Sequence, residues 1–337
     1  MMENIPNVGV FQLFLAMSGY IAVGQTIIIL KKREKLTELM GSLLDEYNGK
    51  TLGKDKIINE RLSGKILMTL IISIVLSILG CIVVTESLPN LEVIKVNSEI
   101  FHRKYPDRVI GFLLWLPFDS SVSPQNEVTR VIVYLTIFLS VPLVAVRFSL
   151  LPVMALHLVG IFETVSSKIG KLKYSCTENT DETIIEIIKL HQKALMISKN
   201  LVEFFRPIIL LKAIFSFWMF AVLMVVITEE PIGSSIFINC AFCLLCSGYE
   251  LLLDCWSGEQ LARKSEKVGV AAYQCQWDRM SNSARKNLVL LTLRAQRPIQ
   301  LDVRPYLIPM SLKTYVQIMK ASFSCYTLLL SIKAEKH

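Results

Sequence analysis

The sequence has few of the residues from which catalytic and metal sites are built. Only four of its 337 residues are histidine, and none has a second histidine at ligand spacing. It contains no Walker loop, dinucleotide fingerprint, HExxH or GxSxG motif. Cys240, Cys243 and Cys246 form a CxxCxxC pattern, but they lie in a charge-free apolar segment without the fourth ligand and the proline of an iron–sulfur motif. We therefore predict no enzyme, no cofactor and no metal, and interpret these cysteines as packing residues.

The sequence also lacks a basic arm or an aromatic-studded basic patch, although its formal net charge is +8. The basic residues are distributed over particular loops, which argues against a nucleic-acid partner. Hydrophobic residues make up 53% of the chain and the mean hydropathy is +0.49. A soluble core of this size does not need so many apolar residues, so the composition indicates an integral membrane protein.

Six long apolar segments predict an all-α fold, namely a polytopic helical membrane protein that forms a single domain over residues 1–337. The third segment is too long for a perpendicular span, and Pro142 and Pro152 are available as kink points. The predicted spans cover residues of about 11–30, 66–84, 131–161, 207–228, 231–256 and 305–332.

Loop charges predict the orientation of these spans. Residues 31–65 hold nine Lys or Arg, residues 157–206 seven and residues 257–308 nine, whereas residues 88–127 hold four. By the positive-inside rule the first three stretches are cytoplasmic, which places both chain ends outside. Apolar residues at helical spacing around Ile184 to Leu195 and Ala284 to Leu293 predict that the cytoplasmic stretches form a packed helical layer.

The last apolar segment is unusually polar for a membrane helix. Lys313, Gln317, Lys320, Ser324 and Ser331 fall on one stripe of it, which only Leu328 interrupts. Because polar side chains in a membrane face protein or water, this stripe predicts a helix that lines an aqueous path, with Leu328 at its narrow point. The alternative is a helix whose polar groups bond to neighbouring helices.

Charged residues near the inner ends of the spans form a second candidate constellation. Arg206 and Lys212 can pair with Glu250 and Asp254, with Arg147 nearby. One hypothesis is a gating or ion-relay network, and the other is a set of structural ion pairs with interfacial side chains.

The carboxyl-terminal third resembles the insect odorant receptor family, in particular the expanded receptors of bees, wasps and ants. The likeness rests on AAYQCQW (271–277), LRAQRP (293–298), the Ser311 to Tyr315 segment and SFSCYT (322–327), with WLPFDSS (115–121) upstream. These blocks follow one another in the family's order over nearly the whole chain. The family has seven spans and a cytoplasmic amino terminus, and residues 11–30 match its second helix. We therefore expect that the family's first helix is missing here, through a truncated gene model or clone.

The resemblance implies an odorant-gated, non-selective cation channel in the plasma membrane, assembled with the odorant receptor co-receptor as a hetero-oligomer, which we expect to be a tetramer. It also implies a cytoplasmic anchor between subunits over about 257–304 and an extracellular carboxyl terminus. In the family the last helix lines the pore. By position, the pore residues are Ser324, Leu328, Ser331 and Ile332, and Lys320 is then awkward for cation passage unless it faces a wide vestibule or is offset by co-receptor subunits.

The resemblance further implies an odorant pocket in the outer half of the membrane. Large apolar side chains suit a volatile ligand, which gains affinity by burying apolar surface; ordinary packing is the alternative for each of them. The candidates are Phe14, Met17, Tyr20, Leu79, Tyr134, Phe138, Phe220, Met224 and Phe237.

Three other functions would each require sequence features of their own. A gustatory receptor of the same superfamily shares the fold, but the last helix has no clear match to the TYxxxxxQF ending of that family. A rhodopsin-like receptor has the opposite orientation and a DRY-type triplet, and neither is found. A secondary transporter is expected to show an internal repeat with interrupted helices, and the two halves of this chain show none.

Overall fold

The computed structural model describes residues 5–48, 56–85, 94, 97–99, 102–108, 116–172, 180–303 and 308–334. In these ranges the chain is almost entirely helical, which confirms the predicted all-α class. The elements are α1 (Ile5–Lys31), α2 (Arg33–Asn48), α3 (Lys56–Thr85), α5 (Gln125–Lys171), α6 (Thr180–Glu229), α7 (Ser235–Gln274), the 3-10 turn η2 (Trp277–Arg279), α8 (Asn282–Ala295), the strands β1 (Asp302–Val303) and β2 (Ile308–Pro309), and α9 (Leu312–Ala334).

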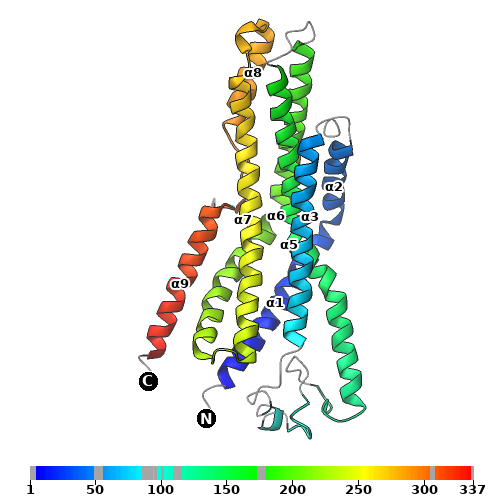
Figure 1. Ribbon diagram of the computed structural model, residues 1–337, viewed down its shortest axis with the longest axis vertical. Coiled ribbons are helices and arrows are strands. Elements are labelled where there is room, and N and C mark those ends of the chain that lie inside the picture. Colours follow the sequence, from blue (N-terminus) through cyan, green and yellow to red (C-terminus); the bar gives the residue numbers. More distant parts are fainter. Residues whose placement is uncertain are drawn as a thin grey trace.

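Helices α5, α6 and α7 form the frame of the molecule and run along most of its length (Figure 1). They contain 47, 50 and 40 residues. At 1.5 Å per residue, even 40 residues extend about 60 Å, whereas a bilayer core is only about 30 Å thick. Each helix is therefore long enough to cross a membrane and continue well beyond it, and α5 does so without a break at Pro142 or Pro152.

By length and composition, four helices in the described part of the chain can cross a membrane. They are α3 over Glu60–Gly80, α5, α6 over Asp181–Glu229 and α7. Helix α1 is apolar over the shorter range Ala16–Lys31. Helix α9 falls short because its polar stripe lowers its hydropathy. It also begins later than the predicted span, because Pro309 pairs in β2 and the Ser311 hydroxyl accepts a hydrogen bond from Thr314 N, 3.3 Å away, at the helix start.

Apolar packing is densest at the end of the molecule that carries α8 (upper end in Figure 1). Phe162, Leu201, Phe204, Leu261 and Val268 are all completely buried there. The apolar positions predicted at 184, 187 and 190 are buried too, and Ala284, Leu288 and Leu291 bury one face of α8. Each large apolar side chain that is fully buried contributes about 1.5–3 kcal/mol, so the predicted packed layer exists and holds these helices together.

The segment between α8 and α9 is attached to α7 at several points. Gly258 lets it approach closely, because a Cβ at that position would lie 2.5 Å from the Met310 carbonyl oxygen. The hydroxyl of Ser265 accepts a hydrogen bond from Ile299 N at 3.0 Å, and the carboxylate of Glu259 accepts one from Leu312 N, also at 3.0 Å. These contacts fix where α9 begins.

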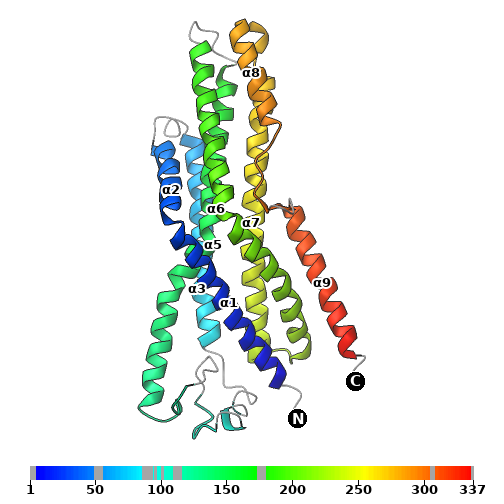
Figure 2. The same cartoon turned by 180° about the vertical axis from the view of Figure 1, so that it is seen from behind.

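Both chain ends lie at the end of the molecule opposite to α8, as Figure 2 shows from behind. Helices α2 and α8, which lie within two of the basic stretches of the sequence, are away from that end. Two termini on the same side agree with an even number of crossings.

Candidate ligand-binding cavity and pore-facing helix

A cavity of about 420 Å³ lies between five helices, α1, α3, α5, α6 and α7. This volume is within the range of small-molecule sites. Apolar and aromatic side chains make up much of its wall, among them Leu76, Val144, Phe148, Phe215 and Phe242. Small residues also line the cavity. At one of them, Gly80, the ring of Phe242 packs so closely that a Cβ would lie 3.1 Å from it.

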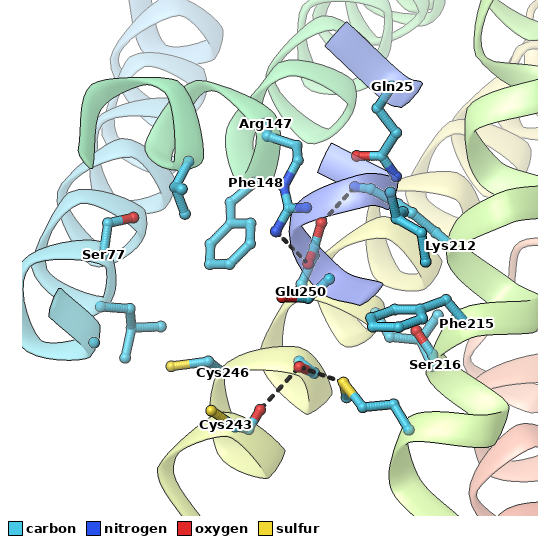
Figure 3. A pocket seen from close by; sticks show the side chains of 18 of the residues that line it. Gln25, Ser77, Arg147, Phe148, Lys212, Phe215, Ser216, Cys243, Cys246 and Glu250 are labelled. Carbon is cyan, nitrogen blue, oxygen red and sulfur yellow. Dashed lines mark hydrogen bonds and ion pairs between the residues drawn. The ribbon is translucent and has the colours of Figure 1, made fainter. Parts of the chain in front are cut away.

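One end of the cavity is charged, and we call it the polar end. It consists of Gln25, Arg147, Lys212, Glu250 and Asp254 (Figure 3). Lys212 Nζ lies 2.8 Å from Glu250 Oε1 and 3.0 Å from Asp254 Oδ2, and Arg147 Nη2 lies 3.9 Å from Glu250 Oε2. Two cations therefore balance two carboxylates, and the pairs connect α5, α6 and α7.

The prediction that Arg206 joins this group is wrong. Arg206 Nη2 lies 3.4 Å from Asp302 Oδ1 of β1. Arg206 is almost two helical turns before Lys212 in α6, which places it beside the α8–α9 connection instead. This ion pair is a further attachment of the α8–α9 connection, here from β1 to α6.

One face of helix α7 lines the cavity from its cysteines to the polar end. Cys243, Ser247, Glu250 and Asp254 follow one another at intervals of four, three and four residues, which is the spacing of a single helix face. Cys243 and Cys246 lie beyond the charged group in Figure 3, and both cysteines are free. The cysteines and the carboxylates were predicted as two unrelated groups; their shared helical spacing is the sequence signal that places them on one face.

The predicted odorant residues occupy the same five helices, but none of them is among the residues that line this cavity. Met17, Tyr20, Tyr134 and Phe138 are exposed on the surface of the chain, as is Leu79. Phe220 is completely buried, whereas Met224 packs against the core and Phe237 is half-buried. The side chain of Phe14 lies outside the described residues. Most of these positions are closer than the cavity to the end that carries the termini.

The polar stripe of α9 faces away from the rest of the chain. Lys313, Gln317, Lys320, Ser324 and Leu328 are exposed, as are Ser331 and Ile332 farther along. The hydroxyls of Ser324 and Ser331 donate to carbonyl oxygens of α9 itself, those of Lys320 and Leu328, at 3.1 and 2.9 Å.

A different face of α9 contacts α6. There the buried Ser322 hydroxyl lies 3.2 Å from the Phe217 carbonyl oxygen. Among the described residues, the two serines of the stripe thus bond within α9, and the hydrogen bond to α6 comes from another face of the helix.

Near the end that carries the termini, Asp119 connects two segments of the loop before α5. Its carboxylate accepts hydrogen bonds from Ser121 Oγ at 2.7 Å, Ser121 N at 2.9 Å and Lys104 N at 3.0 Å. These bonds, the side-chain bond of Ser121 first, hold the pKa of Asp119 below its ordinary value. Ser121 is itself fully buried. Trp115, the first residue of the WLPFDSS block, lies outside the described residues.

These features define a helical membrane protein with a ligand-sized cavity between its long helices. Among the described residues, no group of three or more His, Cys, Asp or Glu is arranged to hold a metal ion. A family model described as 7tm Odorant receptor matches residues 9–323. The chain therefore belongs to this odorant receptor family, as the sequence resemblance predicted, and the family consists of receptors rather than enzymes.

Individual relatives agree with this assignment. Odorant receptor 67c of Drosophila melanogaster is 28% identical, over 74% of this chain and 62% of that protein. The putative odorant receptor 19b of the same fly is 24% identical, over 65% of this chain and 57% of its own length. The chain thus spans about six tenths of the length of these relatives.

Solved structures show the same fold. The olfactory receptor OR5 of Machilis hrabei in complex with eugenol superposes with a TM-score of 0.75, over 93% of this chain and 78% of that one, at 17% identity. A second structure of that receptor gives a TM-score of 0.76 at 15% identity, over 97% of this chain and 82% of that one. The fold is therefore that of an insect olfactory receptor, and the chain is a multi-pass membrane protein.

Proposed function

We propose that this chain is an odorant receptor subunit that binds a small volatile molecule in the five-helix cavity and gates a non-selective cation channel together with the odorant receptor co-receptor. The observation that carries the proposal is a cavity of about 420 Å³ with apolar walls, located between the long helices of a chain of the odorant receptor family. Burial of apolar ligand surface contributes about 25 cal/mol per Å². A volatile molecule with few polar atoms gains its affinity mainly in this way.

The residues predicted from sequence become candidates for the outer approach to this cavity. Met224 and Phe237 lie nearer the outer ends of α6 and α7 than the lining residues do, and the buried Phe220 directly follows the cavity residue Met219 in α6. Met17, Tyr20 and Phe138 contact a ligand only if lipid or a second subunit covers the exposed faces of α1 and α5. The proposed ligand path runs from the outer end of the bundle to the polar end.

The exposed stripe of α9 supports the proposal that this helix lines a pore shared with other subunits. In this arrangement Leu328 is the narrow point, Ser324, Ser331 and Ile332 flank it, and the co-receptor provides the remaining pore helices of a hetero-tetramer. The side chains of Lys313 and Lys320 then face a wide vestibule, where water keeps their charges solvated.

We place the chain in the plasma membrane, in contact with lipid, with its carboxyl terminus outside and the layer around α8 in the cytoplasm; in the full family form the amino terminus is cytoplasmic. The basic stretches around α2 and α8 support this orientation by the positive-inside rule. A tag after His337 should bind antibody on unpermeabilised cells, and a tag at Asn179 should bind only after permeabilisation. The reverse pattern would show that the orientation is wrong.

The function is tested by recording odorant-evoked cation currents from cells that express the chain with the co-receptor, the chain alone, or the co-receptor alone. Odorants that open the channel only when both are present support the proposal. Surface labelling of the tagged chain must accompany each recording. If surface expression is normal and a broad odorant panel evokes no current beyond that of the co-receptor alone, the chain is not an odorant-gating subunit.

A further inference from the structure

Two buried side chains at the polar end have hydrogen-bonding atoms without a partner. Gln25 of α1 is only 1% exposed, lines the cavity, and its Oε1 has no hydrogen-bond partner. Asp254 is fully buried, and its Oδ1 has no hydrogen-bond partner although its Oδ2 pairs with Lys212. Buried polar atoms in folded proteins are almost always paired, so an acceptor that stays free beside a cavity marks a place for a donor.

The polar end also offers a donor. Arg147 Nε is buried and has no hydrogen-bond partner, although its Nη2 faces Glu250. In Figure 3 Arg147 enters from α5, and Gln25 extends from α1 toward the end of Lys212, so the two approach the same charged group. A ligand that reaches this end therefore meets free acceptors and one free N–H.

The charges at the polar end are already balanced. Lys212 and Arg147 face Glu250 and Asp254, so two positive side chains match two negative ones. A ligand with a net charge would add an uncompensated charge to a site with little access to water, which is costly. The site therefore favours a neutral ligand.

We propose that the polar end selects ligands that carry a neutral hydroxyl group, that is, alcohols or phenols, over ethers and esters of the same carbon skeleton. A hydroxyl is one group that both donates and accepts. It can donate to Gln25 Oε1 and accept from Arg147 Nε, while its carbon skeleton fills the apolar part of the cavity. An ether or ester oxygen only accepts, so the acceptor on Gln25 stays unpaired. This inference rests on the proposed function for the identity of the cavity as the odorant site.

Matched ligand pairs test this selectivity: benzyl alcohol with benzyl methyl ether, and hexanol with hexyl methyl ether. Binding is measured through the ligand-dependent shift in thermal aggregation of the tagged full chain, extracted from membranes of cells that also express the co-receptor. This readout does not depend on channel opening. In the wild type the alcohols should bind roughly tenfold more tightly than their ethers, the size expected for one buried hydrogen bond.

Substitutions then assign the preference to Gln25. Gln25→Leu keeps the approximate volume and removes the acceptor, so it should bring the alcohol and the ether to within about twofold of each other. Gln25→Met is the second variant, since it keeps the side chain unbranched. Thr26→Val is the matched control: the neighbouring Thr26 is exposed, bonds to the Ala22 carbonyl oxygen at 2.8 Å and does not line the cavity. It should keep the wild-type preference.

Equal affinities for alcohol and ether in the wild type would overturn the proposal, and would show that water or neighbouring side chains satisfy these atoms. A preference that survives both Gln25 variants would overturn it as well. So would the failure of all four probes to bind. If the alcohols bind selectively but no odorant evokes a current with the co-receptor, the ligand preference stands and the channel function fails. The two outcomes are therefore separable.

Discussion

Lys212 is a buried cation whose charge is balanced by two carboxylates from one face of α7. Its side chain is 8% exposed, and that of Asp254 is 1% exposed. Replacing Lys212 with Met would leave Glu250 and Asp254 close together with only Arg147 to offset them. Breaking a buried ion pair on one side costs about 3–5 kcal/mol. We expect Lys212→Met to lower the thermal aggregation temperature of the extracted chain clearly, and to reduce its surface expression.

Lys35 provides the comparison for Lys212. It pairs with Glu203 at 3.3 Å, but both side chains are about two-fifths exposed, at 43% and 40%. Exposed pairs contribute at most about 1 kcal/mol, so Lys35→Met should have little effect on the same assay. Equal losses in the two variants would mean that the polar end is far more hydrated than its burial indicates.

Asp119 should make the loop before α5 sensitive to acid. Its pKa lies below the ordinary value because Ser121 and the Lys104 amide donate hydrogen bonds to the charged carboxylate. A lowered folded-state pKa gives stability that is complete above the unfolded-state pKa and is lost as the pH falls through the folded-state pKa. Hydrogen exchange at residues 102–108 and 116–121, corrected for the intrinsic rate, should therefore accelerate on acidification below about pH 4.

The variant Asp119→Asn isolates that effect. An amide cannot carry the charge that the three donors stabilise, so exchange in this loop should be faster at neutral pH and should depend less on pH. Glu127 in the first turn of α5 makes a suitable control, because it is an acidic residue near the same loop. If the loop is protected from hydrogen exchange equally well in Asp119→Asn and the wild type, the Asp119 carboxylate does not stabilise it.

Gly258 decides how closely the α8–α9 connection approaches α7. A methyl group there would lie 2.5 Å from the Met310 carbonyl oxygen and 3.3 Å from the Leu301 side chain. Because Met310 is only two residues before α9, Gly258→Ala should displace the start of that helix and cost about 1–3 kcal/mol, as overpacking does. A lower aggregation temperature, together with altered basal current, is the expected result.

Gly64→Ala is the matched control for this element. Gly64 is a helical glycine of α3, and a Cβ there meets no atom within 4 Å. The change should be neutral or stabilise the chain by up to about 1 kcal/mol, because alanine loses less backbone entropy in a helix. If both glycine variants behave alike, the contact with Met310 does not constrain α9.

The long helices were predictable because a long apolar run that crosses a membrane forms a helix. The packed layer near α8 followed from apolar residues at helical spacing, such as Ile184 and Leu288, which are buried as expected. The start of α9 was not predictable: Pro309 belongs to an apolar run, yet it pairs with Asp302 across a gap in sequence. Pairing of this kind depends on the position of α7, which no local pattern encodes.

The cavity was harder to predict than the helices. Large aromatic and Met side chains were predicted to form the pocket, whereas space in a bundle arises where side chains are small, as at Gly80, Ser216 and Cys246. Large residues such as Phe220 fill the bundle instead. The charged residues Lys212, Glu250 and Asp254 were correctly paired from sequence. That they border a cavity depends on how five helices pack, which no local pattern shows.

At the scale of the whole molecule, α9 is the element whose exposed face is explained best by other subunits. Its polar stripe is directed away from α6 and α7, and the apolar Leu328 interrupts that stripe while remaining 59% exposed. A ring of large apolar side chains can close a pore by excluding water, since ions that enter lose hydrogen bonds that the walls cannot replace. In a shared pore, Leu328 would be this subunit's contribution to the ring.

Leu328→Ser should let water into the narrow point and raise the basal current of the channel formed with the co-receptor, normalised to surface protein. The increase should be partial, because the co-receptor subunits keep their own constricting residues. Leu330→Ser is the matched control: it lies about half a turn around α9, is half-buried, and should affect packing or expression rather than basal current. Equal basal currents for Leu328→Ser and the wild type at equal surface expression would exclude this face of α9 from the pore lining.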